Sequence, residues 1–512
     1  MQTATKRNAV VAITLAALLA GQCAYGPRNV RTLVPPGELE TLDRRAPYLK
    51  AHLRDGGVYV LGRWQVDEAA RTVEGEGERQ GPDRATIETG HFIVPIATVA
   101  LFEANVVPAS KSLRDLTVIT GFSVALTAAC LTHPKACYGS CPTFYTIKDG
   151  HEQLQAEGFS TSIAPALEHT DLDALYRAAA STRRFEIVMR NEAVETHVVR
   201  HAHVLAAPRP PGGRVLAAAD GQLLQALDLR APSSCHALEG DCLALVATLD
   251  GQERQSRTDG RDLASREVID LEFEPDTIGE EALGLVIGAR QTLLTTYLFY
   301  QTLAYMGHAA GAWMAQFERG PRLEDHAHAM RDALGGIEVE LPDGTGRWTA
   351  VGSVHETGPL ASDVKVLPLP RGMPAGHVRL RLTRGHWRLD LLALARLGLS
   401  VKPVRLPPVE VIREGEGPVR AFTAGPLTAM PGEAHRLVYQ LPPHPQGYEL
   451  FLESRGYYLE WLREAWLAEE DPQKTLQVLW NPRQALVDLA PAFRQQEDAM
   501  EDAFWRSRYV QR

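Results

Sequence analysis

The stretch HVRLRLTRGHWRLDLLAL, residues 377–394, shows the pattern that decides the fold. Apolar and polar residues alternate from His377 to Leu382, and a second apolar-rich run follows Gly385. A period of two predicts strands that bury one face. The same alternation occurs in residues 337–341 and 348–352, on either side of a Pro-Asp-Gly turn. We therefore expect an antiparallel β-sandwich over residues 334–415.

Residues 46–106 predict a small β-barrel. Short apolar runs at 48–53, 58–61 and 91–96 are separated by turns such as Asp55-Gly56-Gly57. About five short strands in some sixty residues are typical of SH3-like or Sm-like barrels. Such barrels host many functions, so this fold would not by itself define one.

The rest of the chain predicts a mainly β, α+β protein with helical insertions. Residues 136–275 contain several strand-like segments and indicate a central β-rich domain. Residues 280–333 indicate a helical segment, in which Ala282–Phe317 is apolar enough to form a long helix or helix pair. A buried helix is favoured, and a membrane span remains the alternative.

Residues 416–512 indicate a mixed α/β C-terminal region. Amphipathic helices are expected between Tyr457 and Tyr509. Asp471-Pro472 and Asn481-Pro482 fit the starts of two of them, because proline is tolerated in the first helical turn.

The N-terminus has the layout of a bacterial export signal. Two basic residues precede an apolar run, Ala9–Ala20, that is short for a membrane span. We expect a signal peptide over residues 1–23, lipidation at Cys23 and a tether over 24–45. Gln22 departs from the usual lipoprotein pattern. Ordinary secretion with cleavage just after the cysteine, and an uncleaved anchor, therefore remain open.

A second apolar segment lies at residues 109–135. Leu116–Leu131 carries no charge, but it is slightly short for a span and contains Thr and Ser. A buried or membrane-apposed helix is favoured, and a membrane segment remains open.

Composition and charge narrow the class of function. The chain has 53 Lys and Arg against 63 Asp and Glu, which gives a net charge of −10. This argues against nucleic-acid binding, which needs clustered basic residues to neutralise phosphates. The sequence has no phosphate loop and no dinucleotide fingerprint, and we expect no cofactor.

The cysteines predict local disulfides. In an exported protein, the close pairs Cys137/Cys141 and Cys235/Cys242 are natural partners. One zinc site made of both pairs is the alternative, although neither spacing is that of a zinc knuckle.

Three histidines form the best metal-like pattern. His197, His201 and His203 have even spacings, which place their side chains on one face of a strand. They could hold Zn²⁺ with Glu192 or Glu195 as a further ligand or base. However, about 3.3 Å per residue separates His197 from His201 by about 13 Å. A half-exposed polar strand face is therefore favoured, and the metal site remains the alternative.

The segment His169-Thr170-Asp171-Leu172-Asp173 has the acidic character of a calcium loop. It lacks the ligand spacing and the glycine of an EF-hand. We interpret Thr170 and Asp171 as the cap of a helix over residues 172–180.

Several segments of the chain resemble known families. CYGSCPTFY (137–145), AEGFS (156–160), NEAVET (191–196) and LESRGYY (452–458) resemble segments of uncharacterised bacterial envelope lipoproteins. Residues 337–395 are similar to galactose-binding-like β-sandwiches, in which a final strand like GHWRLD (385–390) packs the core. The first resemblance implies a location, and the second implies a glycan-binding, protein-binding or structural module.

The sequence therefore predicts an exported protein of the bacterial envelope, facing the periplasm or the cell surface and anchored to the membrane by lipid. A non-enzymatic binding or structural role is favoured, with envelope protein or glycan as partner and no nucleic acid. The alternative is an envelope hydrolase, possibly zinc-dependent, with a site near His201 and His203.

Overall fold

A computed structural model describes residues 30–106, 141–274, 282–310, 332–460 and 469–506. Short gaps within these ranges fall at 35, 47, 54–56, 82–85, 164, 179–182, 194, 308–309, 344, 356–357, 373–374, 423–424 and 431. The predicted signal peptide, Cys23 and the apolar segment 109–135 lie outside the described residues. Within the described part, no helix has the length and apolar character needed to cross a membrane.

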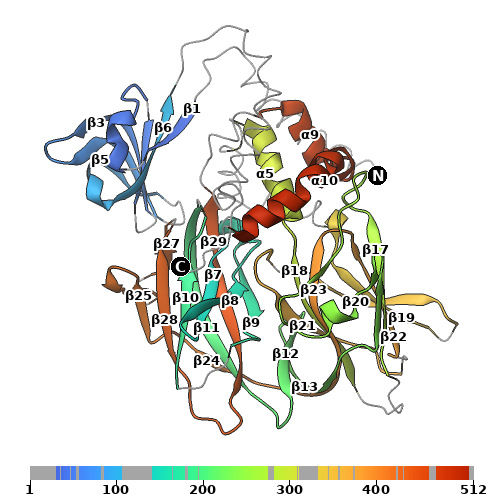
Figure 1. Ribbon diagram of the computed structural model, residues 1–512. Coiled ribbons are helices and arrows are strands. Elements are labelled where there is room, and N and C mark those ends of the chain that lie inside the picture. The colour runs from blue at the N-terminus through green and yellow to red at the C-terminus, as the bar shows by residue number, and fades with distance from the viewer. Residues whose placement is uncertain are drawn as a thin grey trace, which may run out of the picture. The chain divides into compact units, whose positions relative to one another are not determined.

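The described chain is mainly β, with antiparallel sheets and C-terminal helices, which confirms the predicted fold class at this level (Figure 1). It divides into two compact units. One contains the N-terminal sheet and residues 469–480, and the other contains two β-sandwiches and the last helix.

The N-terminal sheet has the strand order β1-β6-β2-β3-β4-β5. Its strands are β1 (Val30–Val34), β2 (Tyr48–Leu53), β3 (Val58–Asp67), β4 (Thr72–Gln80), β5 (Thr86–Pro95) and β6 (Val99–Val106). Five of them fall within residues 46–106, where a small β-barrel was expected, and Leu49, Leu61 and Phe102 are fully buried in its core. The prediction of a tether over 24–45 is wrong for β1, because this segment pairs antiparallel with β6.

The first sandwich combines two segments that lie far apart in the sequence. One sheet contains β7 (Thr143–Lys148), β8 (His151–Glu157), β10 (Arg184–Arg190), β25 (Glu410–Arg413), β26 (Gly417–Pro418) and β28 (Ala434–Gln440). The other contains β9 (His169–Ala174), β11 (Glu195–Pro208), β24 (Val404–Leu406), β27 (Leu427–Ala429) and β29 (Tyr448–Glu460). One buried apolar cluster joins them, and Tyr439 of β28 donates a hydrogen bond to the Ala202 carbonyl of β11 at 3.1 Å.

The second sandwich lies within residues 214–400. Its first sheet contains β12 (Arg214–Ala218), β13 (Leu223–Arg230), β16 (Arg254–Gln255), β18 (Leu283–Gln291), β21 (Asp363–Pro368) and β23 (Trp387–Ser400). Its second sheet contains β14 (Ser234–Ala237), β15 (Gly240–Asp241), β17 (Arg266–Glu272), β19 (Ile337–Pro342), β20 (Trp348–Val354) and β22 (His377–Thr383). Both sheets contribute to one core, in which Trp387 is 1% exposed.

The stretch 377–394 contributes to both sheets of this second sandwich. β22 pairs with β17 and β19, whereas β23 pairs with β18 in the other sheet. Gly385 makes the crossing possible, because its φ of +73° is left-handed and a Cβ there would lie 2.4 Å from Thr258 N.

Two predicted domain boundaries differ from this arrangement. Residues 214–272 lie in the second sandwich rather than in a domain over 136–275, and residues 404–413 lie in the first rather than in a sandwich over 334–415. Sheet pairing between segments far apart in the sequence causes the difference. Patterns read along the chain do not encode such pairing.

The prediction of a long helix over Ala282–Phe317 is wrong in its first part. Residues 283–291 form the strand β18, and the helix α5 (Leu294–Met306) begins only after it. β18 lies between β21 and β23, and all but one of its residues are buried. A strand covered on both faces loses its alternation and resembles a buried helix.

The C-terminal helices are confirmed in part. α9 (Pro472–Trp480) and α10 (Pro482–Arg506) both begin at the expected prolines. Asp471 caps α9, because its Oδ1 accepts hydrogen bonds from the amides of Gln473 and Lys474 at 3.1 Å. Tyr457, where helices were expected to begin, instead lies in the strand β29.

Candidate metal centre

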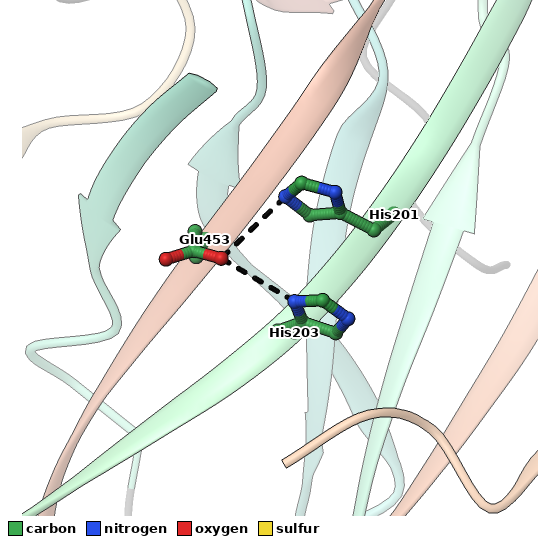
Figure 2. Close-up of side chains that lie close together, drawn as sticks. All are labelled: His201, His203 and Glu453. Atoms are coloured by element: carbon green, nitrogen blue, oxygen red, sulfur yellow. Dashed lines mark hydrogen bonds and ion pairs between the residues drawn. The ribbon is translucent and has the colours of Figure 1, made fainter. Parts of the chain in front are cut away.

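Two histidines and one glutamate meet on the face of the first sandwich that turns away from its core. His201 and His203 lie on β11, and Glu453 lies opposite His203 on β29. Their nearest ligand atoms all lie within 4.8 Å of one another. Glu453 Oε1 is 3.5 Å from His201 Nε2 and 3.3 Å from His203 Nδ1 (Figure 2). Both imidazoles therefore face the same carboxylate oxygen.

The two imidazole rings are stacked. Their centroids are 4.5 Å apart and their planes differ by 6°. This geometry follows from the strand, because residues two apart project from the same face. The strand backbone therefore places both rings side by side.

His197 does not join this cluster, so the prediction that all three histidines share one face is wrong. The pairing of β11 with β29 shifts between Val199 and His201, which adds one residue to β11 at Arg200. A bulge of one residue exchanges the two faces of a strand. His197 is consequently fully buried and lies 2.5 Å from Glu195, away from solvent.

The carboxylates that the sequence offered are also absent from the cluster. Glu195 bonds to His197, and Glu192 accepts hydrogen bonds from Tyr145 at 2.8 Å and Thr143 at 3.0 Å. Glu453 takes their place. Sequence reasoning missed it because the β11–β29 pairing that brings it near joins residues 250 positions apart.

The surroundings of His201 favour its neutral form. Burial lowers the pKa of His201, the neighbouring His203 lowers it further, and Glu453 opposes both effects. Its Nε2 atom is buried and makes no hydrogen bond with any described residue. A neutral imidazole with a free nitrogen is the form that binds a metal ion.

Arg405 holds the other oxygen of the glutamate. Its Nη2 lies 2.6 Å from Glu453 Oε2, which leaves Oε1 facing the histidines. The guanidinium fixes the orientation of the carboxylate, but its charge also opposes a bound cation.

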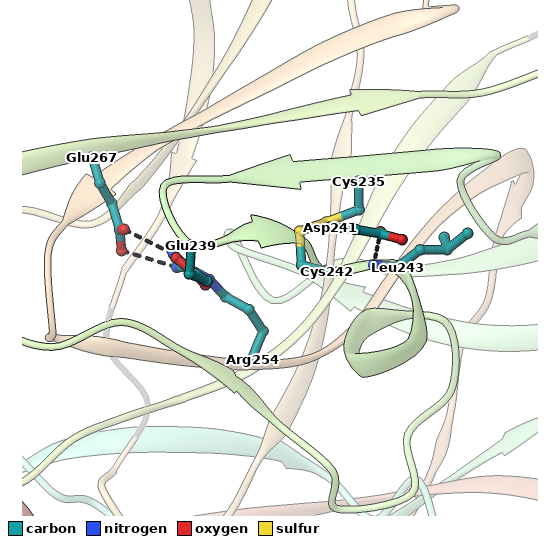
Figure 3. The surroundings of a disulfide bond; sticks show 7 residues. All are labelled: Cys235, Glu239, Asp241, Cys242, Leu243, Arg254 and Glu267. Carbon is teal, nitrogen blue, oxygen red and sulfur yellow. Dashed lines mark hydrogen bonds and ion pairs between the residues drawn. A yellow bond between two sulfur atoms is a disulfide. The ribbon is translucent and has the colours of Figure 1, made fainter.

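The second sandwich contains a disulfide between Cys235 and Cys242 (Figure 3). Both cysteines are buried. In this state their sulfurs are not available as the thiolate ligands that the alternative zinc site required. Cys141 is buried, and its predicted partner Cys137 lies outside the described residues.

The acidic segment 169–173 forms part of β9, so its interpretation as a helix cap is wrong. β9 pairs antiparallel with β29 at the edge of its sheet. Asp171 accepts a hydrogen bond from the Phe159 amide at 3.1 Å, and burial raises the pKa of its carboxyl. The local pattern suggested a cap because Asp and Thr favour both positions, and only the pairing with β29 decides between them.

Comparisons with known proteins add no family. No family model matches the chain, and no curated protein matches it. Among solved structures, a mutant of Salmonella alpha-2-macroglobulin matches at 8% identity with a TM-score of 0.09. The match covers 80% of this chain and 34% of that one, so the chain spans about a third of that protein's length. A TM-score this low carries no argument about the fold.

Proposed function

We propose that this chain is a zinc-binding protein of the bacterial envelope, with its metal centre at His201, His203 and Glu453. One observation carries the proposal. A buried His201 Nε2 without a hydrogen bond faces the same carboxylate oxygen as His203 Nδ1. Buried polar atoms are normally paired, and a shared metal ion would satisfy both imidazoles and the carboxylate at once.

Small side-chain movements would complete the centre. Zinc binds nitrogen and carboxylate oxygen at about 2.0–2.2 Å, and the ion would lie among three donor atoms that are already close together. Three protein ligands leave a fourth position for water. Because Arg405 lies beside the carboxylate, we expect a modest affinity, with a Kd that is roughly micromolar.

The cellular setting is part of the proposal. The export-signal pattern of residues 1–23, the cysteine at position 23 and the resemblance of 137–145 to envelope lipoproteins support a lipid anchor. The disulfide Cys235–Cys242 is consistent with an oxidising compartment. The intact mass of protein extracted from membranes tests this. A diacyl or triacyl adduct on a chain beginning at Cys23 is expected, and an unmodified chain would contradict the anchor.

Within that setting we favour a non-enzymatic role, in which the β modules bind envelope protein or glycan. The expectation of an SH3-like or Sm-like barrel over residues 46–106, and the resemblance of residues 337–395 to galactose-binding-like sandwiches, favour binding or structural modules. Many members of both classes have no enzymatic activity.

A zinc-dependent hydrolase is the second candidate. It is favoured by the fourth coordination position, where zinc would lower the pKa of bound water. Zinc-dependent turnover of a fluorogenic ester or peptide panel, lost in His203→Ala, would select the enzyme. Zinc binding without turnover would select the binding role.

Zinc titration of the metal-free protein tests the centre itself. Wild type should bind one zinc ion per chain at this site, and His201→Ala, His203→Ala and Glu453→Gln should each weaken binding at least about 100-fold. His377→Ala is the matched control, since His377 is an exposed strand histidine 3.9 Å from a single glutamate. Equal affinity in all five proteins would overturn the proposal.

A further inference from the structure

The two sandwiches, which belong to one compact unit, meet along the edge strand β9 of the first. β21 of the second sandwich lies beside β9, but no strand of the described chain pairs with that edge. Instead, Asp363 Oδ1 accepts a hydrogen bond from the Ala174 amide at 2.9 Å. Lys365 Nζ donates to the Leu172 carbonyl. Two charged side chains of the second sandwich therefore take the place of a neighbouring strand.

A third hydrogen bond crosses between the sandwiches nearby. Glu157, the last residue of β8, accepts at Oε2 from the Leu360 amide at 2.8 Å. The approach is close, because a Cβ on Gly358 would lie 2.0 Å from the same oxygen. We call the contact of Glu157 and β9 with residues 360–365 the joint. Each of these three bonds has an ionisable side chain as one partner.

The joint holds more acidic than basic groups. Asp171 and Asp173 of β9 lie here with Glu157 and Asp363, and Lys365 is the cation that acts on the three aspartates. Lys365 Nζ is 2.7 Å from Asp363 Oδ2. Full ionisation would place four negative charges against one positive charge, largely out of water. Coulomb repulsion therefore favours the retention of protons within the joint.

Other charged groups near the joint do not balance this excess. Arg290 of β18 favours the ionised form of the glutamate, but its guanidinium contacts both oxygens of a carboxylate in its own sandwich. His169, on β9 itself, favours the ionised form of Asp171. The charged residues of β29 beside β9, Glu453 and Arg455, form their ion pairs with partners outside the joint.

Two of the four carboxyl groups favour the protonated form. Burial raises the pKa of Glu157 to about 7, although the Leu360 amide opposes the shift. Burial also raises the pKa of Asp173 well above its usual value, and Asp171 and Asp363 raise it further. Asp173 Oδ2 is buried and accepts no hydrogen bond from any described residue. An ionised oxygen in that position would be costly.

We propose that the joint is a pH-sensitive switch, which holds the two sandwiches together at mildly acidic pH and loosens as the pH rises. With Glu157 and Asp173 protonated, Lys365 and Asp363 can hold the edge of β9. Loss of both protons would add two negative charges to the acidic residues already there. Because the closed joint binds protons that the open joint releases, rising pH favours opening. The switch does not depend on the zinc centre.

Hydrogen exchange of the full chain at pH 6 and pH 8, corrected for intrinsic exchange rates, tests this inference. The amides of Ala174 and Leu360 donate across the joint, so peptides that contain them report its opening. We expect their protection to fall at least about tenfold between the two pH values, whereas peptides from β23 keep theirs. Equal protection at both pH values, or an equal fall in β23, would overturn the inference.

Variants assign the effect to the carboxyl groups. Glu157→Gln/Asp173→Asn stays uncharged at both positions, so its joint should be almost as protected at pH 8 as at pH 6. Glu272→Gln is the matched control, because it removes an exposed carboxylate of β17 outside the joint, and it should respond as wild type does. A wild-type response in the double variant would contradict the switch.

Asp173→Asn alone should show a smaller fall than wild type, and it replaces the double variant if that protein does not fold. A chelator is present in every sample. The outcome is therefore independent of the zinc proposal.

Discussion

Two polar clusters, one in each sandwich, differ in how completely their hydrogen-bonding groups are used. In the second sandwich, Arg254 is fully buried and donates to both oxygens of Glu239 and both oxygens of Glu267 (Figure 3). In the first, His201 and His203 face one oxygen of Glu453 at 3.3–3.5 Å.

This difference underlies our proposal that the Arg254 cluster is structural and the histidine cluster binds zinc. All three nitrogens of the Arg254 guanidinium donate to these two carboxylates, so no nitrogen of the fork is left without an acceptor. His201 keeps a buried nitrogen without a hydrogen bond among the described residues, which is where we propose that the metal ion binds. Burial of charge alone therefore does not mark a site. A cluster of polar side chains that face one another and lack some of their hydrogen bonds is a better indicator of a functional site.

Removal of Arg254 should have the largest effect on stability. Arg254→Met leaves Glu267 buried without its cation, and we expect a loss of about 3–5 kcal/mol in the free energy of unfolding. Urea denaturation measures it. Zinc affinity of the folded variant should be unchanged, and a loss below about 1 kcal/mol would show that this cluster is not structural.

Glu157 is a buried carboxyl that should make the stability of the protein depend on pH. Burial raises its pKa from 4.5 to about 7, despite a hydrogen bond from the Leu360 amide at 2.8 Å. The folded state therefore holds a proton that the unfolded chain releases. This contribution to stability is present below pH 4.5 and is lost as pH rises through about 7.

Glu157→Gln should remove that loss. The variant should be more stable than wild type by up to about 3 kcal/mol at pH 8 and nearly equal to it at pH 4. Denaturation curves at the two pH values measure the difference. If the variant were less stable than wild type at pH 8, the fold would stabilise the charged carboxylate, and a raised pKa for Glu157 would be contradicted.

The loss of folding stability that we expect at acid pH should come from two buried histidines rather than from Glu157. Burial lowers the pKa of His386 to about 3 and that of His435 to about 4. Their contribution to stability is present above pH 6.5 and is lost as pH falls toward those values. Glu157→Gln should leave this acid loss unchanged, and its disappearance in that variant would contradict the assignment.

The disulfide should have a smaller effect on stability. Cys235 and Cys242 close a short loop, with a sequence separation of 7, so the entropy gained is limited. The double variant Cys235→Ala/Cys242→Ala should lose about 2 kcal/mol, measured by urea denaturation. Its zinc affinity should equal that of wild type. A parallel loss of zinc binding would place these cysteines in the metal centre.

The sequence pattern correctly predicted those structural features that depend on residues close together in the sequence. The alternation in 377–394 predicted strands, and the prolines at 472 and 482 predicted helix starts, because both signals act within a few residues. β18 was missed because strands covered on both faces lose their period.

The candidate site was predicted only in part for a similar reason. His201 and His203 were identified because their spacing of two is a local property. The bulge at Arg200 and the arrival of Glu453 depend on pairing with a strand near the other end of the chain. No local pattern specifies that register, so His197 was wrongly included and Glu453 was missed.

The most direct test is the position of zinc in crystals of the metal-loaded protein, located by anomalous diffraction at the zinc edge. We expect a peak about 2.0–2.2 Å from His201 Nε2, His203 Nδ1 and Glu453 Oε1. Zinc bound elsewhere, with these three side chains still arranged as in Figure 2, would contradict it.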